Sequence, residues 1–132
     1  MQWNELVTRV REHGHYATDA ETKQVTRVVL SAIGGHLGNG VRERVAGRLP
    51  ATAAETLRYQ LPATKPLTAA EFVESVARRI DGATLSTARW DVSSVLSVLG
   101  EVCGDDLTDQ VIADLPQGYA LLFGRAELLN SA

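Results

Sequence analysis

Two long segments of the chain, residues 22–37 and 88–103, carry apolar side chains at spacings of three and four residues. This spacing places them along one face of an α-helix, which completes a turn in 3.6 residues. The apolar positions are Val25, Val28, Val29, Ala32, Ile33 and Leu37 in the first segment, and Val92, Val95, Leu96, Leu99 and Cys103 in the second. No alternation with a period of two persists, so the pattern predicts a central helix in each segment, covered on most sides.

Both central segments belong to a longer internal similarity with a constant offset of 66 residues. Without any gap, this offset relates residues 5–57 to residues 71–123. Identical pairs include Glu5/Glu71, Val7/Val73, Val10/Val76, Thr18/Thr84, Val29/Val95, Leu30/Leu96, Ser31/Ser97, Gly34/Gly100, Gly38/Gly104, Val45/Val111, Leu49/Leu115 and Pro50/Pro116. The apolar positions also stay in phase along the whole span. The similarity therefore predicts an internal duplication.

Shorter amphipathic segments flank each central helix. Helices are expected over residues 3–11, 41–48 and 51–59 in the first copy, and over 107–114 and 117–125 in the second, with a break at 13–16. Each Leu-Pro pair, at 49–50 and 115–116, predicts a corner between two helices, because proline is tolerated at the start of a helix. Residues 60–67 contain two prolines and are expected to form a linker.

Local sequence signals set the expected ends of these helices. Thr18 with Glu21 and Thr68 with Glu71 match the capping box, in which each side chain binds the other residue's backbone N–H group. The box at Thr84 is expected to be incomplete, since residue 87 is threonine. Glycine favours the left-handed conformation that follows many helices, so the central helices are expected to end at Gly38 and Gly104.

The combined pattern predicts an all-α fold of about eight helices and no sheet. Two tandem four-helix repeats, at about 3–59 and 68–126, are expected to pack into one domain of residues 1–132. Each half alone would bury only a modest core, which is why the two should pack against each other. The end of the chain after Leu129 is expected to be frayed.

Composition narrows the class of protein. The chain of 132 residues is 45% apolar and 22% charged, as is typical of a globular domain. No apolar run approaches the ~20 residues of a membrane span, and the N-terminus lacks the pattern of a signal peptide. The single cysteine excludes an internal disulfide. These features predict a cytoplasmic protein without a membrane partner.

Charge is distributed unevenly between the halves. Residues 1–66 contain nine Lys or Arg and six Asp or Glu, a net charge of +3, whereas residues 67–132 contain four and ten, a net charge of −6. One interpretation is a dipolar molecule with solvated charged faces. The other is that the two halves bind different partners, or that molecules associate head to tail.

The repeated pattern resembles a known family. A helix with the sequence Glu71-Phe-Val-Glu-Ser-Val76, a long Val/Leu-rich helix, a short helix and a closing Leu115-Pro116 are similar to the bacterial domain of unknown function family 2267. In the first copy, the segment from Glu5 to Val10 and the Leu-Pro pair at 49–50 carry the same likeness. The resemblance implies a bacterial, helical, two-repeat protein. It implies no activity and no site residues.

Residue types with catalytic or ligand-binding chemistry do not form a recognisable motif. His13 and His15 are two residues apart, and the sequence lacks the Glu-x-x-His and Cys-x-x-Cys pairs of metal sites. Cys103 lies on the apolar face of its helix and is expected to be a buried structural thiol. The glycines from Gly34 to Gly40 do not follow a strand and lack the lysine of a phosphate-binding loop. We therefore expect no catalytic residue, cofactor or metal.

The leading functional hypothesis is a non-enzymatic helical module that binds another protein, through a groove between the two repeats or through the faces of the fourth helices. Aromatic residues dominate the energetics of protein interfaces. The candidate anchors are Tyr59, Trp90, Tyr119 and Phe123, each of which has a core position as its alternative interpretation.

A second hypothesis is a nucleic-acid- or ribosome-associated bacterial stress protein with a basic edge in its first half. The candidate phosphate contacts are Lys23, Arg27, Arg42, Arg44 and Arg48. The acidic character of the whole chain, with a pI of about 5.6, and its few aromatic residues argue against it. A third hypothesis, an enzyme or ligand carrier with a pocket between the repeats, requires a cavity with convergent polar groups.

Overall fold

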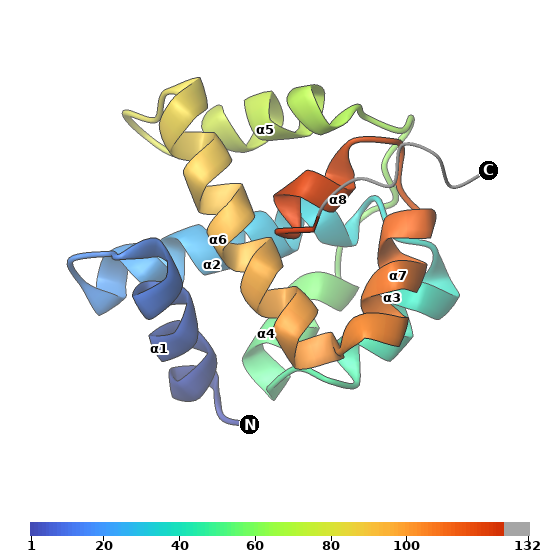
Figure 1. The fold of residues 1–132 in the computed structure, drawn as a ribbon, viewed down its shortest axis with the longest axis horizontal. Helices are drawn as coiled ribbons and strands as arrows, with labels where there is room; N and C mark the ends of the chain where they lie inside the picture. The colour runs from blue at the N-terminus through green and yellow to red at the C-terminus, as the bar shows by residue number, and fades with distance from the viewer. Residues whose placement is uncertain (126–132) are drawn as a thin grey trace.

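The computed structural model describes residues 1–125, which form eight helices and no strand (Figure 1). The helices are α1 (Trp3–Gly14), α2 (Asp19–Gly34), α3 (Asn39–Ala46), α4 (Ala51–Arg58), α5 (Ala69–Ala77), α6 (Leu85–Cys103), α7 (Asp105–Ala113) and α8 (Tyr119–Leu122). The predicted all-α fold is confirmed. None of these helices in residues 1–125 combines the length and the apolar character needed to cross a bilayer.

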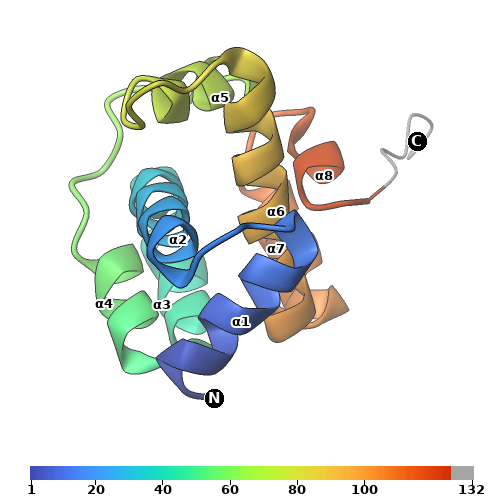
Figure 2. The same cartoon turned by 90° about the vertical axis from the view of Figure 1, so that its left-hand side faces the viewer.

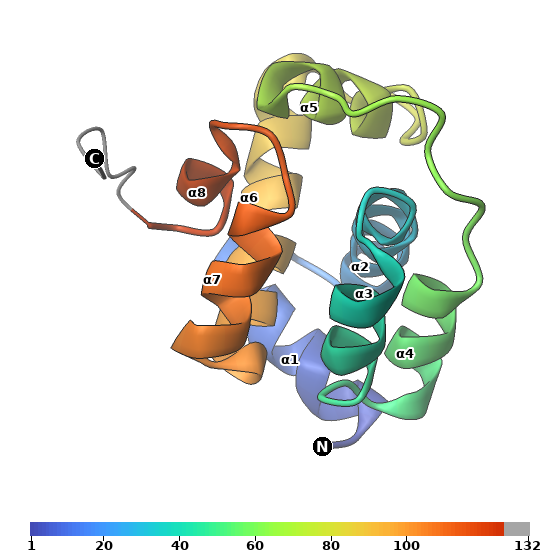
Figure 3. The same ribbon diagram turned by 90° about the vertical axis from the view of Figure 1, so that its right-hand side faces the viewer.

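The two long helices, α2 and α6, cross at the centre of the molecule. Figures 2 and 3 view α2 nearly along its axis, with the other helices around it. α6 contacts α1, α2, α5, α7 and α8, and α2 contacts α1, α4 and α5 as well. The broad apolar faces predicted for both helices are thus covered on most sides.

Helices of the two halves pack against each other rather than side by side as separate units. α1 lies against α6, α5 lies against α2, and α3 lies against α7. One hydrophobic cluster includes Val10 of α1, Ile33 of α2, Val76 of α5 and Leu96 of α6. The first three helices of each half also begin 66 residues apart, at residues 3, 19 and 39 and at 69, 85 and 105. This spacing agrees with the offset in the sequence, while the tandem duplication itself stays a prediction.

The expected end of the first central helix is wrong. α2 ends at Gly34, four residues before Gly38, whereas α6 ends directly before Gly104, whose φ of 82° is left-handed. A Cβ atom at Gly34 would lie 2.3 Å from the Leu57 carbonyl oxygen, so glycine permits the close approach of α4. The Gly34 carbonyl oxygen accepts a hydrogen bond from Arg42 Nη1 at 3.2 Å, which replaces the bond that a longer helix would make.

Two of the three capping predictions are also wrong. The Thr18 side chain accepts a hydrogen bond from the Glu21 N–H group, but the reciprocal bond is not made, so this box is half formed. The box at Thr84 is complete, because the Thr87 hydroxyl accepts the Thr84 N–H group at 2.9 Å. A threonine side chain reaches the cap as glutamate would. The box from Thr68 to Glu71 forms as predicted.

Most other boundaries shift by a few residues. α1 continues through the expected break to Gly14, and α3 and α7 each begin two residues before their predicted starts. α8 is a single turn, shorter than the helix expected over 117–125, because Gly118 and Gly124 on either side adopt positive φ values of 103° and 76°. The linker at 60–67 contains no helix, as predicted. The expected frayed end after Leu129, and residue 126 of the second repeat, lie outside the described residues.

Tyr119 and Phe123 are buried in the core, which corrects their assignment as surface anchors. Tyr119 is 0% exposed, and its hydroxyl donates a hydrogen bond to the Leu67 carbonyl oxygen at 2.9 Å. Its ring lies edge-on to that of Phe72, with 5.6 Å between the centroids. Tyr119 therefore fastens α8 to α5 and to the end of the linker, and cannot contact a partner on the surface.

We expect Tyr119→Phe to lower the free energy of unfolding by about 1 kcal/mol, because the Leu67 carbonyl loses its donor. Tyr119→Ala should lower it by about 3–5 kcal/mol, the usual loss for a buried aromatic ring. The matched control is Tyr59→Ala: Tyr59 is 80% exposed, so this change should stay within about 0.5 kcal/mol. Urea denaturation followed by circular dichroism measures all three. Equal effects of the two alanine variants would contradict the core assignment.

Candidate functional site

The two remaining aromatic candidates are exposed but lie on different elements. Tyr59 directly follows α4, whereas Trp90 is 52% exposed on α6. The Trp90 indole Nε1–H donates a hydrogen bond to the Gly14 carbonyl oxygen at 2.9 Å, so the end of α1 fixes the orientation of the ring. The four residues predicted as anchors therefore do not form one surface, and Trp90 is the one held in place by a polar contact.

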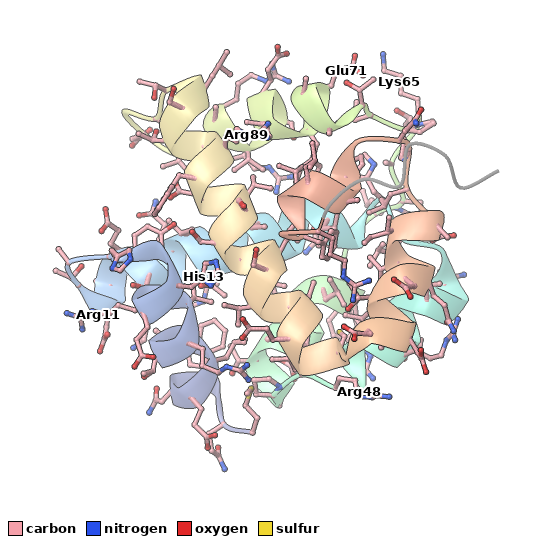
Figure 4. All side chains as sticks on the ribbon, in the orientation of Figure 1. Arg11, His13, Arg48, Lys65, Glu71 and Arg89 are labelled. Carbon is pink, nitrogen blue, oxygen red and sulfur yellow. The ribbon has the colours of Figure 1, made fainter. Side chains whose placement is uncertain are left out.

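Several of the predicted basic residues make contacts within the molecule. The Arg27 guanidinium carbon lies 5.3 Å from the centroid of the Trp3 ring. Arg42 also hydrogen-bonds to the Asn39 side chain. Arg48 Nη1 donates to the Cys103 carbonyl oxygen at 2.8 Å, next to the end of α6 (Figure 4). There a positive charge stabilises the negative end of the helix dipole.

The basic residues are also divided between two regions. Lys23 and Arg27 lie on the first half of α2, at the left in Figure 1. Arg42 and Arg44 lie on α3, at the right, and Arg48 follows that helix. They do not line up along one helix face as a phosphate-binding row would. No feature of residues 1–125 specifically favours the nucleic-acid hypothesis.

The histidines occupy three separate places. His15 ends α1 in the left-handed conformation, with φ of 56°, and His13 is exposed on the last turn of that helix. The His36 ring lies edge-on to Phe72, 5.8 Å between centroids, and partial burial, together with the nearby Arg79 charge, lowers the pKa of this imidazole. Within the described part of the chain, no three His, Cys, Asp or Glu residues come together in a metal-binding arrangement.

Cys103 is buried at the end of α6, as the apolar pattern predicted. Burial raises the pKa of its thiol to about 11, while the positive charge of Arg48 acts in the opposite direction. The thiol is therefore protonated at neutral pH. A protonated, buried thiol is a poor nucleophile.

A groove of about 640 Å³ lies where corresponding segments of the two halves meet. Its walls are formed by residues 14–17, 21, 24 and 25 from the first half, and by residues 80–83, 86, 87, 90 and 91 from the second. Each of the first-half residues has its counterpart, 66 positions later, in the opposite wall. The two loops involved, α1–α2 and α5–α6, both lie on the side that faces the viewer in Figure 2.

A buried carboxylate lines this groove. Asp91 is 8% exposed, and its Oδ1 atom accepts a hydrogen bond from the Tyr16 hydroxyl at 2.6 Å. Burial raises the pKa of Asp91, the nearby Glu21 charge raises it further, and the hydrogen bond from Tyr16 opposes both. Burial and the adjacent Asp91 acceptor likewise raise the pKa of Tyr16, which keeps its hydroxyl protonated as the donor.

The position of Asp91 could have been noticed in the sequence. It lies between Ala88 and Val95 on the buried face of α6, and its counterpart at offset 66 is the buried Val25. Tyr16 has Gly82 as its counterpart. A carboxylate on an otherwise apolar stripe is the signal. Its partner could not be found from spacing, because Tyr16 lies 75 residues away in a loop.

A second hollow, of about 410 Å³, lies beside α1, α6 and Phe123. Its charged side chains are already paired, since Arg125 binds both Asp105 and Asp109. This hollow therefore presents no unbalanced charge to a ligand, and the groove is the stronger candidate site.

The variant Asp91→Asn should be more stable than the wild type at pH 7. Because the folded-state pKa of Asp91 is raised, the stability that this group contributes is fully present below its unfolded pKa of about 3.9. It is lost as the pH rises through the folded-state pKa. Asparagine does not ionise and retains an oxygen that accepts the Tyr16 hydroxyl.

Melting temperatures measured from pH 3 to pH 8 test this expectation. The two proteins should converge at the acidic end and separate above it, with the variant the more stable. Glu101→Asn, at an exposed position outside the groove, is the control and should show no such divergence. A variant that is less stable than wild type at pH 7 would contradict the assignment.

Comparison with known proteins gives one assignment. A family model described as "Uncharacterized conserved protein (DUF2267)" matches residues 3–122, from the first residue of α1 to the last residue of α8. No curated protein matches the chain. The match covers most of the 132 residues, and the resemblance noted in the sequence is confirmed. The chain belongs to the DUF2267 family.

Proposed function

We propose that the protein is a non-enzymatic binding module that binds another protein through the groove between segments 14–25 and 80–91. The observation that carries this proposal is the half-exposed Trp90 ring at a groove of about 640 Å³. A hollow of this size lined by aromatic and convergent polar side chains is the usual form of a binding site.

The fixed orientation of Trp90 supports the proposal. An aromatic side chain that is already held before binding loses little conformational entropy when a partner packs against it. The hydrogen bond from Nε1 to the Gly14 carbonyl holds the indole while much of the side chain stays accessible. Tyrosine and tryptophan residues placed in this way contribute most of the free energy at many interfaces.

The non-enzymatic part of the proposal rests on the chemistry of the groove. Its protonatable groups are His15, Tyr16 and three carboxylates, Glu21, Asp81 and Asp91. The Tyr16 hydroxyl is committed to Asp91 as a hydrogen-bond donor, and its raised pKa makes it a weak acid. The thiol of Cys103 does not line the groove. We infer that the groove recognises a partner rather than transforming a substrate.

The test compares variants in affinity capture from a lysate of the host. Trp90→Ala should reduce capture of the specific partner at least tenfold, because the anchor is removed. Gln24→Trp should do the same by filling the groove, since Gln24 is an exposed groove residue on α2. Tyr59→Ala removes the other exposed aromatic candidate and should leave capture unchanged.

Melting temperatures of all three variants establish that each is folded. Loss of capture with Tyr59→Ala alone would place the binding surface beside α4 and contradict the groove. Capture that survives both groove variants would also contradict it. Capture that disappears on nuclease treatment of the wild-type sample would transfer the assignment to nucleic acid.

A further inference from the structure

The carboxylate of Asp91 has no positive partner in the groove. Its Oδ1 atom accepts the Tyr16 hydroxyl, but Oδ2 accepts no hydrogen bond from residues 1–125. Since no fully buried side-chain oxygen or nitrogen of this part of the chain lacks a partner, Oδ2 retains accessible surface. A carboxylate that is largely removed from water without a cation is destabilising. This group is therefore suited to pair with a positive charge from outside.

The remaining side chains of the groove add to the same requirement. Glu21 and Asp81 also line it, and no Lys or Arg does. The groups that face Asp91 are thus Tyr16 and His15 from the α1–α2 loop, Glu21 from α2 and Asp81 from the α5–α6 loop. At neutral pH the local field is negative, which attracts cations and repels phosphates and carboxylates.

Trp90 supplies a surface that favours an organic cation. The face of an indole ring attracts a positive charge within about 6 Å, and it does so more strongly when water is excluded. Trp90 and Tyr16 both line the groove that contains Asp91. The same residue that anchors the proposed interface therefore also contributes to recognition of charge.

Asp91 and its partner also depart from the repeat in a matched way. Their counterparts at offset 66 are Val25 and Gly82, neither of which can form a charged or hydrogen-bonded pair through a side chain. The two halves thus contribute similar backbone segments to opposite walls, and only one combination of side chains creates the buried acid. This asymmetry indicates a site built for a ligand, because two apolar residues would cover the core at a lower free-energy cost.

We infer that the groove binds a compact organic cation, an ammonium or guanidinium group, which pairs with Asp91 and lies against the ring of Trp90. This inference rests on the proposed function and deepens it, since it names the chemistry by which the partner is recognised. A metal ion is the poorer fit, because the acidic and histidine side chains of residues 1–125 are not grouped as metal ligands. The volume of the groove accommodates a Lys or Arg side chain as well as a small amine in solution.

Isothermal titration calorimetry on the full chain at low ionic strength tests the inference with three probes. They are choline, its uncharged isostere 3,3-dimethylbutan-1-ol, and a Gly-Lys-Gly tripeptide with blocked ends. Choline or the tripeptide should bind at least tenfold more tightly than the alcohol. Raising the salt concentration should weaken the cation, as expected for an ion pair that is partly exposed to solvent.

Two groove variants and a control locate the site. Asp91→Asn should weaken binding of the cation at least tenfold while the protein remains folded, since this variant is expected to be the more stable at neutral pH. Trp90→Ala should also weaken it. Glu101→Gln removes an exposed carboxylate that pairs with Arg9 outside the groove, and should leave the affinity unchanged.

The three probes separate the possible results. Tight binding of the tripeptide assigns the cation to a side chain of a partner protein, and binding of choline alone assigns it to a free amine; both support the inference. Equal affinity for choline and the alcohol, an unchanged affinity in Asp91→Asn, or no binding of either cation at tens of millimolar would overturn it.

The inference and the proposed function fail in distinguishable ways. Capture of a partner that depends on Trp90, without binding of any cationic probe, would leave the protein-binding function standing and remove the cation site. Cation binding that depends on Asp91, without any effect of the groove variants on capture, would do the reverse.

Discussion

The apolar face of α6 is the constraint on which the arrangement of the other helices depends. Its side chains are buried along five turns, from Ala88 to Cys103. Helices of both halves are needed to cover this face, and α1 and α2 of the first half pack on it together with α5, α7 and α8 of the second. Because α5 in turn covers α2, neither half could leave without exposing the apolar face of the other.

Polar contacts across the two halves orient this packing. Arg9 pairs with Glu101, Arg48 binds the carbonyl end of α6, and the Asp114 carboxylate accepts the Gly38 N–H group at 2.8 Å. In each of the two contacts made by an arginine, the basic first half supplies the positive charge. The unequal net charges of the halves are thus used partly inside the molecule, although exposed pairs such as Arg9 and Glu101 add little free energy.

The groove is a consequence of the same crossed arrangement. Corresponding loops meet where the halves face each other, so the walls are similar in backbone but differ in side chains. The buried acid at Asp91 lowers stability at neutral pH, since burial opposes its ionisation. Sites that bind ligands commonly contain such locally unfavourable groups, and the rest of the core supplies the stability that tolerates them.

The sequence by itself determined the class of fold, the number and order of the helices, and the burial of Cys103, because all of these follow from helical periodicity and local capping chemistry. It placed Gly104 correctly and Gly38 wrongly, since the end of α2 depends on Arg42 and on the close approach of α4. Only the tertiary structure separated the exposed Trp90 from the buried Tyr119 and Phe123, and only it brought Tyr16 to Asp91. Burial and distant pairing depend on how the helices cross, which the pattern along a single chain does not specify.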